Sequence, residues 1–306
     1  MSPESRLQSS HRDRPLFAIG LVLASTVFLS CSDVTAKYLA SSVPAIEIAW
    51  LRYLVFLLIV LPPLLRTGAK RVFASQRPGL QVFRGFALVI SSILFISSLR
   101  FLPIAEATAT SFAAPIFITA LSVAVLGEKV GHRRWAATCA GLIGVLAVVR
   151  PGTSAFQPAS ILPLLAALSW ASAVVVTRKT SAVDSAITTL AYSAAIGVLV
   201  LSILLPLVWT PPDWSTMGFG VLIGCAATAG HSLIIVAFRY GDASVLAPFT
   251  YAQLVWATGL GVLLFGSVPD GWTIAGATMI VASGLYIAHR ERIRSRERAA
   301  STARSA

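Results

Sequence analysis

Long apolar stretches separated by short polar loops run through almost the whole chain. The clearest pair, 107–127 and 135–149, flanks a short charged segment that contains Glu128, Lys129 and Arg133. About 20 uncharged apolar residues let a helix cross the ~30 Å hydrocarbon core of a bilayer. The same pattern along the chain predicts ten such helices, at 15–39, 44–65, 79–101, 104–126, 134–149, 159–177, 185–209, 215–238, 243–266 and 271–289. We therefore expect an all-α polytopic membrane protein.

Two features inside these stretches predict local structure. Pro115 lies within the predicted helix 104–126, where it removes a backbone hydrogen bond. A membrane helix tolerates such a break when neighbouring helices or a polar cavity satisfy the freed carbonyl. Ala136, Ala140 and Gly144 follow one another at helical spacing, and this ladder of small residues predicts a closely packed helix pair.

The second half of the chain repeats the first at an offset of 139 residues. The offset pairs Gly127 with Gly266, Tyr53 with Tyr192, Gly85 with Gly224, and Arg100 with Arg239. These matches indicate a tandem duplication. We expect two five-helix repeats, 15–150 and 159–289, joined by a linker at 151–158 and flanked by tails at 1–14 and 290–306.

Composition and charge agree with this picture. The chain is 56% hydrophobic and only 12% charged, against about 25% charged in soluble domains. Its net charge of +12 comes from basic residues in loops and tails, which favours a membrane protein over a nucleic-acid-binding one. The three cysteines lie inside apolar stretches, and no Cys/His group has metal-ligand spacing. We expect no cofactor and no metal, and the sequence leaves a homodimer open.

The distribution of lysine and arginine predicts the orientation. Twenty of the 24, among them Arg84 in the predicted loop between the second and third helices, fall on the side that holds both termini. Positive residues concentrate on the cytoplasmic side, so both termini are expected in the cytoplasm. With five helices per repeat, the second copy then crosses the membrane upside down. Inverted repeats are typical of secondary transporters, whose solute site lies near the midplane. We expect a bacterial-type inner membrane location.

The order of spans and several local motifs resemble the EamA type of the drug/metabolite transporter superfamily. The resemblance covers about residues 15–290. It is carried by Pro115, Leu126-Gly127-Glu128, Arg134-Trp135, the stretch from Gly141 to Arg150 with Pro151 after it, and Arg52. The second half departs from the pattern, because Ser267 stands at the counterpart of Glu128 and Pro248 does not align with Pro115. The resemblance implies transport of a small organic metabolite, with S-adenosylmethionine and riboflavin among the solutes of similar proteins.

Four charged residues within predicted spans are the first site candidates, because charges in a bilayer are costly. Asp33 and Lys37 share a face of the first helix, and Glu47 and Arg52 lie in the second. Their repeat counterparts are uncharged, which favours a site over packing. Other interpretations stay open: Asp33 and Lys37 form an internal ion pair, Lys37 and Glu47 extend to the interface, or Arg52 pairs with Asp33. If protons drive transport, we expect Glu47 to be the coupling group.

Polar and aromatic residues at mid-span complete the candidate set. His231 is either a proton-relay group or a hydrogen-bonded packing residue, and Gln253 has the same two interpretations. Trp170 is the best aromatic candidate for stacking on a solute, and Tyr251 is a further one. Together these residues suit a flat, polar, nucleotide-like or vitamin solute.

Other function classes fit the sequence less well. There is no G-x-x-x-x-G-K-[ST] motif for ATP-driven transport and no H-E-x-x-H motif for a metalloprotease. A membrane-embedded serine protease would have to use the adjacent His231 and Ser232, which point about 100° apart on a helix. We therefore predict a secondary transporter that works by alternating access, with an exporter of amino acids or drugs as the main alternative and a membrane-embedded enzyme as the alternative class.

Overall fold

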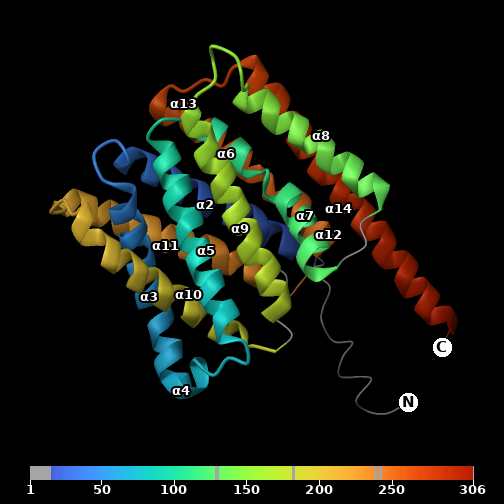
Figure 1. The fold of residues 1–306 in the computed structure, drawn as a ribbon, viewed down its shortest axis with the longest axis horizontal. Helices are drawn as coiled ribbons and strands as arrows, with labels where there is room; N and C mark the ends of the chain where they lie inside the picture. The colour runs from blue at the N-terminus through green and yellow to red at the C-terminus, as the bar shows by residue number, and fades with distance from the viewer. Residues whose placement is uncertain (1–14, 128–130, 181–182, 238–239, 241–242, 306) are drawn as a thin grey trace.

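The computed structural model describes residues 15–127, 131–180, 183–237, 240 and 243–305. The predicted tail 1–14 and the charged residues Glu128, Lys129 and Arg239 lie outside the described residues. Within them the chain is helical throughout (Figure 1). The elements are α2 (Pro15–Leu39), α3 (Ala45–Thr67), α4 (Ala69–Val72), α5 (Pro78–Leu99), α6 (Ile104–Ser111), α7 (Ala114–Leu126), α8 (His132–Val149), η1 (Pro158–Ser160), α9 (Ile161–Thr180), α10 (Ala186–Leu204), η2 (Leu205–Leu207), α11 (Trp214–Ala237), α12 (Ala243–Thr250), α13 (Ala252–Phe265) and α14 (Gly271–Ser305).

The described chain contains eight helical segments long and apolar enough to cross a membrane. Two shorter apolar helices, Trp135–Val149 and Gly271–Ile287, stand at the positions of the fifth and tenth predicted spans. The all-helical membrane architecture is thus confirmed, while the count of ten spans stays a prediction.

Three boundaries differ from the sequence prediction. α10 ends at Leu204, and the predicted continuation to residue 209 is a 3₁₀ turn that contains Pro206. α14 continues through the basic segment 290–305, which projects beyond the bundle at the C-terminus (Figure 1). Arg84, which we placed in a loop, lies in the second turn of α5.

Two helices are broken at equivalent positions in the two halves. α6 gives way to α7 at Phe112 and Ala113, and α12 gives way to α13 at Tyr251. α12 begins and ends 139 residues after α6, although Pro115 and Pro248 are not counterparts. Tyr251 donates to the carbonyl of Pro248, a three-residue turn in place of the helical four. The helix break therefore occurs at the same place in both repeats, although the proline beside it stands at a different position in each.

Both broken helices also end alike. Gly127 after α7 and Gly266 after α13 adopt left-handed conformations, with φ of 68° and 63°. A residue with a Cβ is strained in this region, so glycine suits this helix end. The glycine pair from the 139-residue offset thus has a structural reason.

Counterpart helices run in opposite directions. Glu47 at the start of α3 contacts Thr210, which follows the end of α10, its counterpart. At the other end of the bundle Ser75, beyond α3, contacts Asp184, which precedes α10. The two repeats are therefore inverted relative to each other. We name the two ends of the bundle the Asp270 end, which also holds Glu47, and the Asp184 end.

The repeats pack against each other through matched helix pairs: α2 on α11, α5 on α9, α3 on α10 and α8 on α14. The last pair lies side by side along one edge of the bundle (Figure 1). A Cβ on Gly144 would lie 2.8 Å from the carbonyl oxygen of Gly276, so the two backbones touch. Gly144 of the predicted ladder thus lies at the contact, whereas Ala136 is exposed and its neighbour Ala137 accepts a hydrogen bond from Ser283 across the pair.

Candidate functional site

Asp33 and Gln253 form the first half of a polar cluster inside the bundle. Asp33 lies in α2 and is only 7% exposed. Its Oδ2 accepts a hydrogen bond of 3.0 Å from Nε2 of Gln253 at the start of α13. Ser30, also on α2, donates to the backbone carbonyl of Gln253 at 3.2 Å. The break at Tyr251 thus presents the first turn of α13 to α2, and Gln253 satisfies a buried carboxylate.

Arg52, His231 and Trp170 form the second half. Nη2 of Arg52 in α3 lies 3.4 Å from Nε2 of His231 in α11. A guanidinium has only donors, so this nitrogen of His231 must accept and the ring is neutral in this contact. The ring of Trp170 in α9 stacks on His231, with centroids 6.0 Å apart and 24° between planes.

The two halves form one electrostatic unit. The positive charge of Arg52 acts on Asp33, His231 and Tyr53. In the described structure the Asp33 carboxylate and the Arg52 guanidinium are not within ion-pair distance of each other. Asp33 is hydrogen-bonded to Gln253 instead, and Arg52 contacts His231. α2 and α3 belong to the first repeat, and α9, α11 and α13 to the second. We call Asp33, Arg52, Trp170, His231 and Gln253 the central cluster.

Three other predicted site residues lie outside the central cluster. Lys37 does not pair with Asp33: its Nζ donates to the carbonyls of Leu99 and Leu102, at 3.0 and 2.7 Å. The last four carbonyls of a helix lack donors within the helix, and the negative end of the helix dipole favours a cation there. Lys37 therefore fastens the end of α5 to α2.

Glu47 and Tyr251 also have structural partners. Oε2 of Glu47 accepts hydrogen bonds from the backbone N–H and the hydroxyl of Thr210, at 3.2 and 2.7 Å. Its Oε1 is buried and has no partner within the described structure. Tyr251 packs against Phe112, the equivalent residue at the other helix break, with ring centroids 4.9 Å apart. Proton coupling by Glu47 stays a prediction, and its geometry is that of a loop anchor.

Arg84 is a charged residue that the sequence analysis missed as a site candidate. From α5 its Nε donates to the Thr177 hydroxyl at 2.6 Å, and Nη1 donates to the Thr189 carbonyl at 3.3 Å and to the Ser193 hydroxyl. It was assigned to a loop because it follows a run of basic residues that was predicted to connect the second and third spans. The apolar run from residue 79 onward was the available signal that Arg84 lies within a helix.

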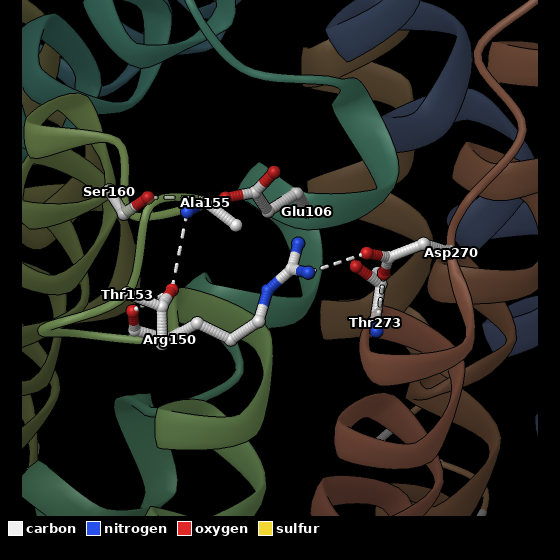
Figure 2. Close-up of polar contacts among 7 residues, drawn as sticks. All are labelled: Glu106, Arg150, Thr153, Ala155, Ser160, Asp270 and Thr273. Atoms are coloured by element: carbon white, nitrogen blue, oxygen red, sulfur yellow. Dashed lines mark hydrogen bonds and ion pairs between the residues drawn. The ribbon is translucent and has the colours of Figure 1, made fainter.

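A further polar cluster joins the repeats at the Asp270 end (Figure 2). Arg150, just after α8, makes an ion pair of 2.7 Å with Asp270, just before α14. Figure 2 shows the Arg150 guanidinium between Asp270 and Glu106, and Ser160 donates to Glu106 at 3.1 Å. Hydrogen bonds from Thr273, followed in size by the Arg150 charge, lower the pKa of Asp270. The Arg150–Asp270 and Ser160–Glu106 contacts each connect a residue of the first repeat with a residue of the second.

Asp184 joins the repeats at the opposite end. Its carboxylate accepts hydrogen bonds from Gln81, Ser75 and the backbone of Gln76, at 2.8, 2.6 and 2.9 Å. Its slight burial raises the pKa, but these hydrogen bonds outweigh burial and lower the pKa of Asp184. Among the described residues no group of three or more His, Cys, Asp or Glu side chains could hold a metal ion.

Comparison with known proteins agrees with this architecture. The EamA-like transporter family matches residues 16–150 and again residues 157–288. An S-adenosylmethionine uptake transporter of Rickettsia felis is 30% identical over 90% of this chain and 94% of its own length. A riboflavin transporter of Vibrio cholerae is 32% identical over 91% of this chain and 95% of its own.

Two more distant matches extend the comparison. A pseudopaline exporter of Pseudomonas aeruginosa is 26% identical over 89% of this chain and 95% of its own length. A solved crystal structure, 21% identical, covers 89% of this chain and 98% of its own with a TM-score of 0.61, which shows a shared fold. The chain belongs to the EamA-like transporter family of the drug/metabolite transporter superfamily.

Proposed function

We propose that this protein is a secondary transporter that moves a small organic metabolite across the inner membrane by alternating access, and not an enzyme. The central cluster carries the proposal. It brings together a carboxylate, a guanidinium, an indole, an imidazole and an amide, contributed by five helices of both repeats. Charges in spanning segments are functional candidates by default. A site shared by inverted repeats changes its exposure when one repeat moves against the other.

The contacts of the cluster favour a flat, polar solute. Trp170 is 39% exposed, so part of its ring remains available for stacking. Arg52 and Asp33 offer one charge of each sign, and Gln253 offers an amide. A nucleotide-like metabolite or a vitamin of the S-adenosylmethionine or riboflavin type suits this combination. The named relatives include both uptake transporters and an exporter, so import and export are both compatible with the fold.

Transport is tested directly in proteoliposomes. The purified protein is reconstituted and offered a mixed metabolite pool under a proton gradient, and the accumulated solutes are identified by mass spectrometry. We expect one or a few solutes to accumulate over protein-free vesicles. Arg52→Gln should abolish the accumulation, while Arg100→Gln, an exposed arginine beyond the end of α5, should not. Accumulation unaffected by Arg52→Gln would rule out the central cluster as the site.

We further propose that both termini are cytoplasmic. This orientation rests on the positive residues at the Asp184 end and in the terminal segments. In a background without Cys31, Cys139 and Cys225, a cysteine at Ala155 should react with an impermeant thiol reagent from outside, and one at Gly131 should not. The reverse labelling pattern would invert the orientation and leave the transport proposal intact.

A further inference from the structure

Arg84 is an arginine of α5 whose hydrogen-bond partners within the described structure are all neutral. Arg150 pairs with Asp270, and the charge of Arg52 acts on Asp33. The hydrogen-bond partners of Arg84 are two hydroxyls and one carbonyl, and within the described structure no carboxylate lies within ion-pair distance of it. Neutral oxygens solvate a guanidinium but do not cancel its charge. One positive charge inside the bundle is therefore uncompensated.

The position of Arg84 argues against a surface role. It lies about 9 Å along α5 from Pro78 at 1.5 Å per residue, and its partner Ser193 lies about 10 Å along α10 from Ala186. Arginines near helix ends commonly extend toward the interface. The Arg84 side chain instead reaches Ser193, on a helix of the other repeat. Asp184, the nearest anion along α10, is acted on by Arg77 and not by Arg84.

Arg84 is linked to the central cluster through Tyr53. Tyr53 follows Arg52 on α3, and the charges of both Arg52 and Arg84 act on it. Tyr53 packs on α10 at Gly197, where a side chain would collide with its ring, and Gly197 lies one turn beyond Ser193. The arginine and the central cluster are thus neighbouring parts of one polar region between the repeats.

We infer that Arg84 binds a carboxylate of the solute, so that this transporter takes an amino-acid-bearing, zwitterionic metabolite. Nε and Nη1 are occupied by α9 and α10, and Nη2 makes no hydrogen bond to a described group. Nη2 and its two hydrogens suit a singly charged carboxylate. The carboxylate of Asp33 in the central cluster suits the cationic group of the same molecule. The inference deepens the proposed function and rests on it, and it favours an S-adenosylmethionine-like solute over riboflavin, which carries no carboxylate.

The inference is tested with solute pairs that differ only in the carboxylate. Binding to protein in lipid nanodiscs is measured for S-adenosylmethionine and its decarboxylated analogue, and for arginine and agmatine. We expect the wild type to prefer the carboxylate-bearing member of at least one pair about tenfold or more. Arg84→Gln should remove that preference by weakening the carboxylate-bearing member alone, and Arg84→Lys should retain part of it. Arg77→Gln, which alters an exposed arginine, should behave as the wild type.

Several outcomes would overturn the inference. The first is a wild type that binds no carboxylate-bearing member of either pair. The second is a preference for the carboxylate-bearing member that is unchanged in Arg84→Gln. The third is an equal loss of binding for both members of a pair together with a lower melting temperature, which would show that Arg84 has only a structural role. The proteoliposome experiment separates this failure from that of the proposed function. Accumulation of solutes without an acid group would leave transport standing and refute the role of Arg84.

Discussion

Replacing Gly144 by alanine should destabilise the protein by forcing α8 away from α14. The new Cβ would lie 2.8 Å from the carbonyl oxygen of Gly276 and 3.0 Å from Ile280 Cγ1 and Met279 Cβ. Ordinary contacts of this kind begin at 3.4 Å, so the helices must separate by about 0.6 Å. The main obstacle is a backbone atom, which has no alternative rotamer.

The magnitude follows from two opposing terms. Overpacking costs about 1–3 kcal/mol, and a backbone obstacle favours the upper part of that range. Alanine in place of glycine within a helix recovers about 1 kcal/mol. The net loss of about 1–2 kcal/mol should lower the melting temperature by about 2–8 °C.

Gly259→Ala is the matched control. Gly259 lies within α13, and a Cβ there meets no atom within 4 Å. The same chemical change should therefore raise the melting temperature by about 2–4 °C, because only the helix-propensity term remains. Thermal unfolding of both variants in one detergent, followed by a thiol-reactive dye or by size-exclusion chromatography, measures the difference. Shifts of the same sign in both variants would refute the close backbone contact between α8 and α14.

Three further predictions concern single contacts. The pKa of Asp270 is lowered in the folded protein, so the ionised carboxylate stabilises the fold. This stabilisation is fully present above the ordinary pKa of 3.8, and it is lost as the pH falls through the lowered pKa of the folded protein. The melting temperatures of wild type and Asp270→Asn should therefore differ at pH 6, and the difference should shrink as the pH falls below 3.8; a difference that stays constant down to the acid unfolding of the protein would contradict the assignment. Lys37→Met should destabilise the protein by about 1–3 kcal/mol, because two carbonyls lose their donor, and unchanged thermal unfolding would show that water replaces the ammonium. Arg52→Lys should reduce transport about tenfold at near wild-type stability, since lysine lacks the planar fork that reaches His231, and normal uptake would return Arg52 to a structural role.

The membrane architecture could be predicted from the sequence because it depends on one-dimensional quantities. Span length and hydropathy decide which segments enter a bilayer, and the 139-residue offset needs only matching letters. The sequence also identified four of the five residues of the central cluster as candidates, because a polar residue within an apolar span is conspicuous. These are Asp33, Arg52, His231 and Gln253. Trp170 was singled out only by its polar neighbours.

The tertiary structure decided which of these residues meet. Lys37 and Glu47 have the same signal in the sequence as Asp33 and Arg52, yet one binds the end of α5 and the other a loop after α10. The partner of Lys37 lies 65 residues away in the sequence, and that of Glu47 lies 163 residues away. Such pairings depend on how the helices pack in three dimensions, and a hydropathy pattern carries no information about that packing. Arg84 shows the converse, because it follows a basic segment that was predicted to be a loop, while its contacts lie on two helices of the other repeat. Sequence thus determined which segments are apolar enough to enter the membrane, and only the packing of the two repeats decided which polar residues come together in the candidate site.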